Sequence, residues 1–437
     1  MIVQSNRKIL IITYYWPPSG GVGVQRWVNY ALQLQKQGWD PIILTPENPQ
    51  FSLRDEHLVE KVKELKTYKI KIWEPFSLFH TLTGGKNRKE IQQGLVLEKP
   101  DPSFLDRLFV WIRGNLFIPD PRRFWVRTAT REAIRIIKQE KVPILITTGP
   151  PHSMHLIGLK VQNRLKIKWL ADFRDPWTKW DILEKLKVSS WAMKIHQHME
   201  EKVTESADLA ITTSTGMAEA LKIKAVLRNG VSLPEMFTCE PPADTFVIGY
   251  FGLLNDMRNP AVLWLALDQI CREDSHFHEK LEIRIGGIIS EALMSELRGF
   301  EMIGSKFNFL GYLPHNQIFD YYQSCHLLLL LQNKTNNAAW ILPVKYFEYV
   351  ASRRIILALG KRNSELAEAM REYDIGELFE YDDASGIRDF IRYVFEERKL
   401  PHQEDSDKLI EEFSHEEMGK KLENFLLQML NEKQSVQ

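Results

Sequence analysis

The chain has 437 residues, which is too long for one ordinary hydrophobic core and suits two domains of about 200 residues each. Its hydrophobic content of 44% and charged content of 26% are typical of a soluble globular enzyme, and its net charge of +0 gives no indication of a nucleic-acid partner. The three cysteines, Cys239, Cys271 and Cys325, lie far apart without metal-binding spacing, so they indicate neither a disulfide framework nor a structural zinc site and fit a cytoplasmic compartment.

The first apolar segment, residues 9–16, follows Arg7 and Lys8 and so has the order of a signal peptide. It is short, however, no small-residue cleavage site follows it, and Pro17 and Pro18 come next. We therefore expect a buried strand here. Elsewhere no run approaches about 18 apolar residues, so the sequence predicts no membrane-spanning helix.

Segments with strand and helix patterns alternate through the first half of the chain, which indicates an α/β domain with a parallel sheet. The strands are predicted at residues 8–14, 41–45, 144–148, 169–172 and 209–213. The helices are predicted at residues 24–37, 127–140, 153–165, 186–205 and 216–221. Residues 50–125 are less regular.

A second run of the same kind begins near residue 240. Its strands are predicted at residues 246–251, 281–285, 307–310, 326–331 and 355–358, and its first helix at residues 261–271. A final helix, residues 415–430, carries one apolar face. We predict two facing Rossmann-like domains, residues 1–235 and 236–410, followed by a segment, residues 411–437, whose helix packs back across the junction.

The junction between the predicted domains, residues 232–243, contains Pro234, Pro241 and Pro242. Prolines stiffen the chain locally, so bending should concentrate at the ends of this segment. We expect the two domains to close over a ligand by hinge rotation here.

A loop, a helix and a buried strand are predicted across residues 343–358. Lys345 and Glu348 are three residues apart, so they share one helix face near its N-terminus. The unpaired N–H groups and the dipole at that end favour an anion such as a diphosphate, and a carboxylate one turn further on could accept two ribose hydroxyls. The alternative is an ordinary surface Lys–Glu pair.

Glycines link the first predicted strand to the first helix at Gly20, Gly21 and Gly23. They permit unusual dihedrals and a close approach of the backbone to an anion. The dinucleotide fingerprint is only partial, because Arg26 stands where the third glycine belongs and no acidic residue ends the second strand. NAD is therefore weakly indicated, and a tight turn into the helix is the alternative.

Charged and polar side chains follow the third and fourth strands, where parallel sheets bind ligands. Asp172, Arg174 and Asp175 end the fourth strand, and His152 follows the third. Arg174 could hold a carboxylate or phosphate through two hydrogen bonds, and either aspartate could fix its rotamer or a sugar hydroxyl. The alternative is a structural Asp–Arg–Asp network. His152 and His155 lack a third ligand, so we predict no metal.

Together these segments resemble the retaining glycosyltransferases of family four, from residue 9 to about residue 360. The likeness includes the glycine loop, the K-x-x-E-Y run that begins at Lys345, and the turn at Asn229–Val231. Residues 251–259 resemble the family's loop after the first strand of the second domain, with Arg258 in place of a lysine that grips the diphosphate. Residues 307–313 resemble the stretch that seats the nucleobase.

Two departures from the family pattern concern the donor. Leu253 replaces a second basic residue that contacts phosphate, and Trp340 replaces a glutamate that contacts the sugar. Sugar recognition must then come from elsewhere in the same loop, for which Asn336, Asn337 or backbone amides are candidates.

The resemblance implies the GT-B fold and transfer of a sugar with retention, without a metal or cofactor. The donor would be a UDP- or GDP-linked sugar and the acceptor a glycan or lipid-linked molecule in surface-polysaccharide synthesis. The donor-binding candidates are Gly20, Gly21, Gly23, Arg258, Lys345 and Glu348, and the catalytic candidates are His152, Asp172, Arg174 and Asp175. Two alternatives remain open: a nucleotide-sugar epimerase and a catalytically silent protein that binds sugar nucleotides.

Residues 104–138 combine apolar side chains such as Trp111 and Phe124 with arginines such as Arg107 and Arg123. A basic segment rich in aromatic residues can lie in an anionic headgroup layer, so we predict peripheral contact with the cytoplasmic face of the inner membrane. The alternative is that the aromatic side chains belong to the core of the first domain.

Overall fold

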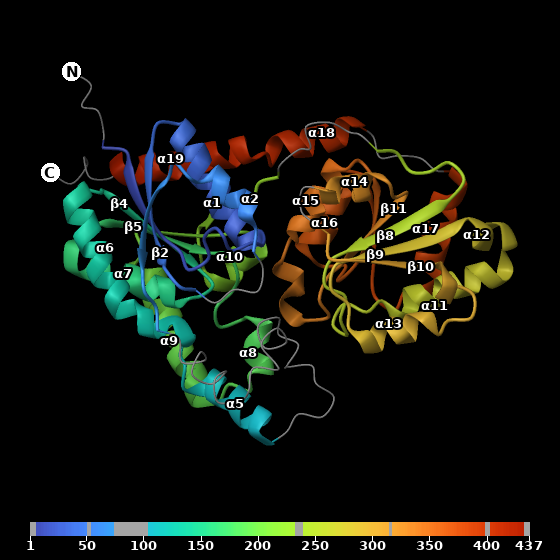
Figure 1. Ribbon diagram of the computed structural model, residues 1–437, viewed down its shortest axis with the longest axis horizontal. Coiled ribbons are helices and arrows are strands. Elements are labelled where there is room, and N and C mark those ends of the chain that lie inside the picture. Colours follow the sequence, from blue (N-terminus) through green and yellow to red (C-terminus); the bar gives the residue numbers. More distant parts are fainter. Residues whose placement is uncertain are drawn as a thin grey trace. The chain divides into compact units, whose positions relative to one another are not determined.

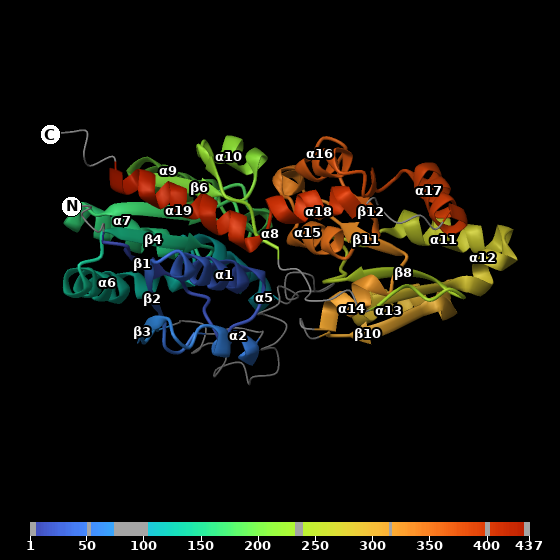
Figure 2. The ribbon, with the colours of Figure 1, turned by 90° about the horizontal axis from the view of Figure 1, so that it is seen from above.

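The computed structural model describes residues 6–49, 54–73, 104–231, 239–313, 317–397 and 403–431. The chain forms two compact units: unit 1 comprises Met1–Asn229 and Met418–Gln437, and unit 2 comprises Gly230–Glu417. Each unit is a parallel sheet with helices on both faces (Figures 1 and 2). The expected hinge includes residues 232–238, which lie outside the described residues.

The described part of unit 1 contains a seven-stranded sheet in the order β3-β2-β1-β4-β5-β6-β7. All its strand pairs are parallel. The strands are β1 Lys8–Ile12, β2 Asp40–Pro46, β3 Lys66–Ile70, β4 Ile144–Gly149, β5 Lys168–Phe173, β6 Leu209–Thr212 and β7 Ala225–Val226. β1 and β4 are neighbours, with Ile9 opposite Ile144. Buried runs such as Ile9–Ile12 are typical of a parallel sheet that is covered on both faces.

The helices predicted in unit 1 are present and begin and end close to the predicted positions, apart from the start of one of them, whereas the described helices between residues 56 and 125 and at residues 181–185 were not predicted. The described helices are α1 Val22–Lys36, α2 Glu56–Lys61, α5 Phe104–Asn115, η2 Pro121–Trp125, α6 Val126–Glu140, α7 Ser153–Leu165, α8 Asp181–Lys185, α9 Ser190–Ser206, α10 Thr215–Leu221 and α19 His415–Asn431. The helix predicted at residues 186–205 is present as α9, but it begins at Ser190. Lys187 has a positive φ of 50°, and the Ser189 side chain caps α9 by accepting a hydrogen bond from the Ala192 N–H at 3.3 Å.

Helix α19 belongs mostly to unit 1, as the predicted return of the C-terminal helix requires. The Oε1 atom of Glu423 accepts hydrogen bonds from Arg7 and from the Trp39 indole, each at 3.1 Å. Gly419 lies so close to Gln33 of α1 that an added Cβ would be 2.7 Å from the Gln33 Cβ. The glycine therefore lets the two helices approach closely.

The described part of unit 2 contains a six-stranded parallel sheet in the order β10-β9-β8-β11-β12-β13. The strands are β8 Phe246–Phe251, β9 Leu281–Gly286, β10 Phe307–Gly311, β11 Leu327–Leu331, β12 Ile355–Leu359 and β13 Gly376–Phe379. The described helices are α11 Ala261–Glu273, α12 Ser275–Lys280, α13 Glu291–Arg298, η3 Gly304–Lys306, α14 Ile318–Gln323, η5 Asn336–Trp340, α15 Val344–Ala351, α16 Glu365–Glu372, α17 Ala384–Glu397 and α18 Gln403–Glu412. The two parallel-sheet, Rossmann-like units confirm the predicted fold class.

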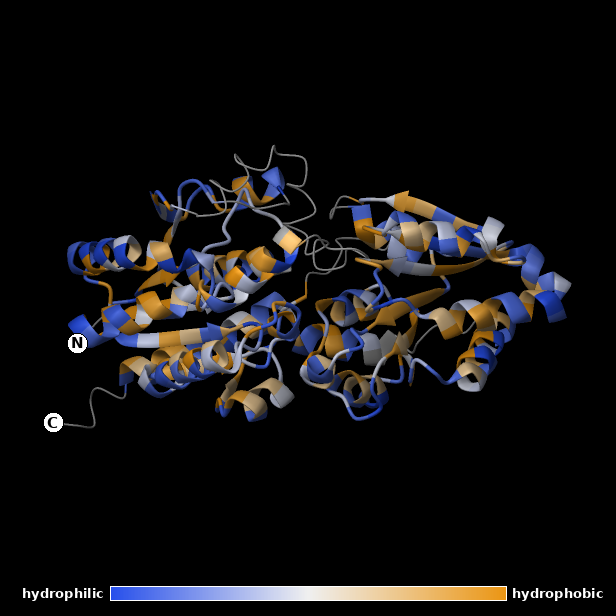
Figure 3. Ribbon diagram, turned by 90° about the horizontal axis from the view of Figure 1, so that it is seen from below, coloured by the Kyte–Doolittle hydropathy of each residue, from blue (hydrophilic) through white to orange (hydrophobic). Residues whose placement is uncertain are grey.

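The hydrophobic cores lie between the sheets and their helices. The strands of both sheets consist largely of hydrophobic residues in Figure 3, whereas the helices around them contain many hydrophilic residues. In unit 2, Trp264 of α11 is fully buried together with Ile283 and Leu329 of the sheet. Among the described helices, none is both long and apolar enough to cross a membrane.

Candidate functional site

In each sheet, the first strands of the chain are added towards one edge and the later strands towards the other, so the strand order reverses at one point. In unit 1 this point lies between β1 and β4, and in unit 2 it lies between β8 and β11. Open parallel sheets bind ligands outside the carboxyl ends of the strands at such a point. The residues predicted to bind the donor or to act in catalysis gather at these carboxyl edges, and each unit is described separately.

In unit 2, helix α15 presents the predicted Lys345–Glu348 pair. Pro343 precedes the helix as the N-cap residue, with an extended ψ of 140° and no side-chain cap. The first N–H groups of such a helix have no partner within the helix, so an anion can bind there. Lys345 and Glu348 are both half-buried.

Lys345 is a cation without a carboxylate partner. Its Cε lies 3.2 Å from where a Cβ on Gly252 would stand, so the side chain lies against the loop after β8. Burial lowers the pKa of Lys345, the nearby Glu348 partly opposes that shift, and the positive charge of Arg258 adds to it. No carboxylate in the described parts of the chain lies within ion-pair distance of Lys345. A bound anion would compensate this charge.

Glu348 is positioned by a buried tyrosine. The Tyr322 hydroxyl donates a hydrogen bond of 2.9 Å to Oε2 of Glu348. Burial, followed by the charge of Glu348, raises the pKa of Tyr322 well above its usual value, so this hydroxyl remains a donor. Because one oxygen of Glu348 is fixed in this way, the other is positioned to accept hydrogen bonds from ligand hydroxyls.

Arg258 lies in the loop after β8 and is held by its neighbours. Its Nε donates to the Asn333 side chain at 2.6 Å, and its Nη1 donates to the Leu253 carbonyl at 3.5 Å. The loop passes the β9 loop so closely that a Cβ on Gly287, which has a φ of 115°, would collide with the Gly252 carbonyl. Unit 2 therefore brings three of the predicted donor-binding residues together: Arg258, Lys345 and Glu348.

A cavity of about 500 Å³ opens at the carboxyl ends of β11, β12 and β13. Its lining consists of amide, charged and aromatic side chains and one glycine: Asn333, Lys334, Thr335, Asn336, Gly360, Lys361, Glu380, Tyr381 and Asp382. Asn333 contributes both to this cavity and to the position of Arg258. Asn336 was predicted as a sugar contact, whereas the Glu380–Asp382 wall was missed because β13 was not predicted.

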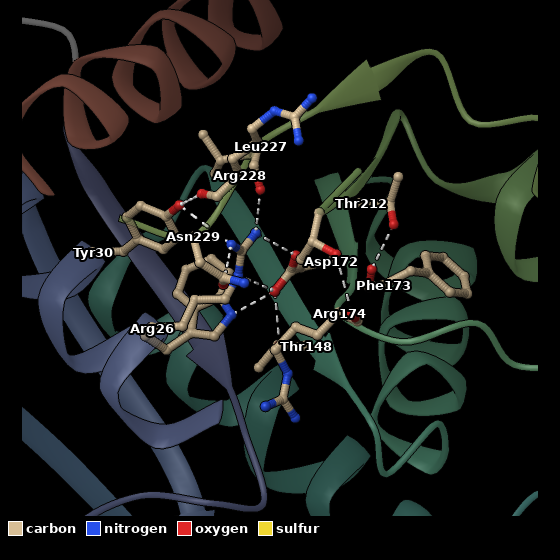
Figure 4. A network of polar contacts seen from close by, with 12 residues as sticks. Arg26, Tyr30, Thr148, Asp172, Phe173, Arg174, Thr212, Leu227, Arg228 and Asn229 are labelled. Atoms are coloured by element: carbon tan, nitrogen blue, oxygen red, sulfur yellow. Dashed lines mark hydrogen bonds and ion pairs between the residues drawn. The ribbon is translucent and has the colours of Figure 1, made fainter. Parts of the chain in front are cut away.

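In unit 1, Asp172 ends β5 inside a buried network (Figure 4). Its exposure is 0%, and its Oδ1 forms an ion pair with Arg26 Nη2 at 3.0 Å. Oδ2 accepts hydrogen bonds from the Trp27 indole at 2.6 Å and from the Thr148 hydroxyl at 2.9 Å. Burial alone would lower the pKa of Arg26, but the charge of Asp172 and their hydrogen bond raise it. This geometry gives Asp172 a positioning role rather than contact with a substrate.

The same network holds the end of the first segment of unit 1, residues 227–229. Arg26 donates to the Leu227 carbonyl and to the Asn229 side chain, each at 2.9 Å, and the Tyr30 hydroxyl donates to the Arg228 carbonyl. The partner of Asp172 is therefore Arg26 of helix α1, and not Arg174 as the predicted structural network would have it. The sequence did contain a signal that Arg26 has a special role, because Arg26 stands where a dinucleotide-binding loop has a glycine.

Arg174 points away from the Asp172 carboxylate (Figure 4). Its Nη2 donates to the Pro150 carbonyl, and a Cβ on Gly23 would collide with its guanidinium. The structure thus brings together the predicted glycine loop and Arg174. Burial lowers the pKa of Arg174, although the charge of Asp175 opposes the shift, and burial raises the pKa of Asp175.

His152 and His155 are both buried at the start of α7. The ring of His152 stacks on Trp177 with centroids 4.9 Å apart, and neither ring nitrogen has a hydrogen-bond partner among the described residues. Burial lowers the pKa of His152 well below its usual value, so its ring is neutral at pH 7. Nδ1 of His155 lies 2.9 Å from the Thr147 hydroxyl, within the buried part of unit 1. In the described parts of the chain, no group of His, Cys, Asp and Glu side chains could hold a metal ion.

Solved structures resemble the chain over nearly its whole length. A glycosyltransferase from Rickettsia africae ESF-5 is 15% identical, with 98% of this chain and 99% of that chain covered and a TM-score of 0.62. HepE from Anabaena, in complex with UDP, is 10% identical, with coverages of 96% and 100% and a TM-score of 0.63. Sucrose-phosphate synthase from Thermosynechococcus elongatus is 14% identical, with coverages of 97% and 99% and a TM-score of 0.62.

The chain has the GT-B fold. This follows from the two parallel-sheet units and from the glycosyltransferases that resemble them. No protein-family profile matches the chain, and no curated protein matches it in sequence. At identities of 15% and below, the likeness establishes the fold and leaves the reaction to be argued from the site.

Proposed function

We propose that the protein is a glycosyltransferase that transfers a sugar, with retention, from a nucleotide diphosphate sugar to a glycan or lipid-linked acceptor in surface-polysaccharide synthesis. The observation that carries the proposal is the pair of cations, Lys345 and Arg258, beside the start of α15 in unit 2. Neither has a described carboxylate as an ion-pair partner, and Glu348 lies on the same helix. HepE, which shares the fold, was solved with UDP and with UDP-glucose.

The chemistry requires stabilisation of the departing diphosphate. An oxygen of the acceptor attacks the anomeric carbon, the bond from that carbon to the phosphate oxygen breaks, and the acceptor proton passes to the departing phosphate. Lys345, Arg258 and the first N–H groups of α15 would stabilise the negative charge that grows on the diphosphate. Glu348 would accept hydrogen bonds from the ribose hydroxyls. The proposal uses no protein nucleophile, no metal and no cofactor.

The acceptor side of the proposal belongs to unit 1. Gly20, Gly21 and Gly23 were predicted to bind the donor, and we propose that their loop also admits the acceptor, since Gly21 and Gly23 stand at the start of α1 and an added Cβ on Gly21 would meet nothing within 4 Å. Arg174 lies directly against this loop, and the neutral His152 ring is packed behind it. We assign Arg174 and Asp175 to contact with the acceptor. We assign to His152 the role of supporting the part of unit 1 that contains Arg174.

Release of free nucleotide tests the proposed reaction and distinguishes it from the two alternatives, a nucleotide-sugar epimerase and a catalytically silent binding protein. The protein is incubated with UDP- and GDP-sugars, with and without acceptor extracts, and nucleotide release is followed by mass spectrometry. We expect release of nucleoside diphosphate that depends on the acceptor. Conversion of the donor without any acceptor would instead identify an epimerase, and binding of nucleotide without release would identify a silent binding protein. Either result would overturn the proposal.

Peripheral membrane contact is a separate part of the proposal. Phe104, Leu108 and Trp111 follow the i, i+4, i+7 spacing of one helix face and are 78%, 39% and 45% exposed on α5. Arg107 is exposed on the same helix. An apolar face with neighbouring cations suits an anionic lipid surface. Trp111→Ser should reduce co-sedimentation with anionic vesicles at low salt, and equal co-sedimentation of variant and wild type would contradict this surface.

A further inference from the structure

The cavity at the carboxyl ends of β11, β12 and β13 takes no part in the steps of the proposed reaction. Its volume of about 500 Å³ lies within the usual range for small-molecule pockets, about 300–1,000 Å³. Three loops of unit 2 form its lining: residues 333–336, residues 360–361 and residues 380–382. Trp340, which departs from the family pattern at the sugar, does not belong to this lining.

The charged side chains of the lining balance one another without pairing. The lining contains two cations and two carboxylates, all of them exposed: Lys334, Lys361, Glu380 and Asp382. No ion pair links any of the four to another described residue. Four charged groups therefore surround one cavity and keep bonding capacity for a ligand.

The two lysines are oriented by backbone carbonyls. Nζ of Lys334 donates a hydrogen bond of 2.8 Å to the Asn259 carbonyl and lies 4.6 Å from the centroid of the Tyr381 ring. Nζ of Lys361 makes one long contact, donating to the Asn336 carbonyl at 3.5 Å. Because an ammonium group has three N–H donors, each lysine retains donors for a ligand.

The two carboxylates retain acceptor oxygens. Oε1 of Glu380 accepts one long hydrogen bond, of 3.5 Å, from the Arg362 backbone N–H. The Arg362 guanidinium is engaged elsewhere, in an ion pair of 3.0 Å with Asp383. The Asp382 carboxylate accepts no hydrogen bond from a described residue. Both carboxylates are thus available to ligand hydroxyls.

Two buried amide side chains beside the cavity each keep one atom without a partner. Gln332 and Asn337 are each 4% exposed. Oε1 of Gln332 has no hydrogen-bond partner among the described residues, and it lies so close to Gly360 of the lining that an added Cβ would collide with it. Oδ1 of Asn337 accepts from the Thr335 hydroxyl at 2.7 Å, whereas its Nδ2 has no described partner. Unpaired buried polar atoms are uncommon because they cost free energy, so they indicate a functional region.

The cavity adjoins the residues assigned to the diphosphate. Oδ1 of Asn333, in the lining, accepts a hydrogen bond of 2.6 Å from Nε of Arg258. The Lys334 backbone N–H donates to the Met257 carbonyl at 2.9 Å, so the loop after β11 is bonded to the loop after β8. In a nucleotide diphosphate sugar, a single oxygen joins the second phosphorus to the sugar. A sugar on a diphosphate held by Arg258 would therefore lie close to Asn333.

The composition of the lining favours a neutral ligand with many hydroxyl groups. A phosphate would need an excess of cations, and an apolar ligand would remove charged groups from water without pairing them. A hydroxyl can donate to a carboxylate and accept from an ammonium or amide group at the same time. The hydroxyls around a sugar ring can therefore bond several of these side chains together.

We propose that this cavity receives the sugar of the donor and that Glu380 and Asp382 select that sugar by accepting hydrogen bonds from its hydroxyls. The inference rests on the proposed function, because the nucleotide diphosphate brings the sugar to the cavity. It assigns specificity to residues after β13, a strand that the sequence did not predict.

The test compares donors that differ in the orientation of one hydroxyl. Isothermal titration of the full-length protein follows UDP-glucose against UDP-galactose and GDP-mannose against GDP-glucose, with UDP and GDP as references. We expect the wild type to prefer one member of at least one pair by about fivefold or more. The double variant Glu380→Ala/Asp382→Ala should lower this ratio of affinities by about fivefold, with the affinity for the bare nucleotide unchanged.

A matched control removes two carboxylates from other parts of unit 2. Asp244 is exposed just before β8, at the opposite edge of the sheet, and Glu279 is exposed on α12. The double variant Asp244→Ala/Glu279→Ala should keep the ratio of the wild type. Glu380→Gln/Asp382→Asn keeps the shape of both side chains and one acceptor oxygen on each, so its ratio should lie between those of the wild type and the alanine variant.

Several outcomes would overturn the cavity as the sugar site. They are equal affinities of the wild type within both pairs, an unchanged ratio in the Glu380→Ala/Asp382→Ala variant, and a parallel loss of affinity for the bare nucleotide. A fall in melting temperature together with the loss of discrimination would assign the carboxylates a structural role instead. In the first two cases, binding of UDP or GDP by the wild type leaves the donor site standing. Failure of both nucleotides to bind would overturn the proposed donor site and this inference with it.

Discussion

The buried ion pair of unit 1 and the charged pair of unit 2 both lie at the carboxyl edge of a parallel sheet, but their charges are balanced differently. Asp172 and Arg26 form an ion pair at 3.0 Å, with side-chain exposures of 0% and 2%. Lys345 and Glu348 share one helix face without reaching ion-pair distance, and Tyr322 holds the carboxylate apart. Removing one member of a balanced buried pair is costly because the other charge is left uncompensated, whereas an unbalanced cation marks a place where a ligand can supply the missing charge.

The largest expected effect is a loss of folding stability at low pH, because unit 1 buries three histidines whose pKa values are lowered by burial. The pKa of His155 is about 3, that of His196 is about 4, and that of His152 is well below its usual value. The unfolded chain takes up these protons near pH 6.5, so their stabilising contribution is complete above pH 6.5 and is lost as the pH falls towards the folded pKa values. Each histidine should cost about 1.4 kcal/mol per pH unit over that interval.

Two histidines of helix α9 form a matched pair for this prediction. His196 is buried and His198 is exposed. His196→Gln should lessen the loss of stability between pH 6.5 and pH 4.5, and His198→Gln should leave it unchanged. Hydrogen exchange of peptides from β4, α7 and α9 at several pH values measures the effect. The same acid sensitivity in all three proteins would show that the buried imidazole of His196 is not a cause.

The second-largest expected effect concerns the buried ion pair between Arg26 and Asp172. Asp172→Ala leaves Arg26 buried without its partner, and such a change typically costs about 3–5 kcal/mol. We expect a marked drop in the melting temperature of unit 1, measured by calorimetry, with the affinity for UDP unchanged at temperatures where the variant is folded. Asp175→Ala is the matched control, since Asp175 is only partly buried and forms no described ion pair. Equal destabilisation by both substitutions would contradict the special role of the Arg26–Asp172 pair.

The third effect is smaller and concerns Glu348. Glu348→Gln keeps the shape of the side chain and the bond from Tyr322 but weakens hydrogen bonds from ribose hydroxyls, for which a loss of about 1 kcal/mol, or roughly fivefold in affinity, is expected. Uridine diphosphate and its 2′,3′-dideoxy analogue are titrated against wild type and variant. The variant should lose affinity for the natural ribose and bind the dideoxy analogue as the wild type does. A parallel loss for both ligands would contradict contact with the ribose.

Short-range spacing was enough to find part of the site. Lys345 and Glu348 were predicted together because residues three apart share a helix face, and Arg174 because it follows a buried strand. Arg258 was predicted only through the family resemblance of residues 251–259. The buried strands themselves were evident from their apolar runs. The edge strand β3 was missed because its five residues, Lys66–Ile70, include two lysines and a threonine, form no apolar run, and are not buried.

Contacts between distant parts of the sequence could not be predicted. Arg26 and Asp172 are 146 residues apart, and no local pattern connects them. How α5 and η2 pack in unit 1 could not be predicted from the basic aromatic segment, residues 104–138, either. The same packing determines which aromatic side chains of that segment are buried: Trp125 is buried, whereas Trp111 is 45% exposed.

The affinity of the full-length protein for UDP tests the central claim most directly. Lys345→Ala removes a charged hydrogen bond to the diphosphate, for which a loss of about 2–3 kcal/mol, or roughly 30- to 150-fold in affinity, is expected. Lys408→Ala, which removes an exposed lysine from α18 of the same unit, is the matched control and should bind UDP as the wild type does. We predict tight binding by wild type and control and a large loss in Lys345→Ala. Equal affinities in all three proteins would contradict a donor site at the start of α15.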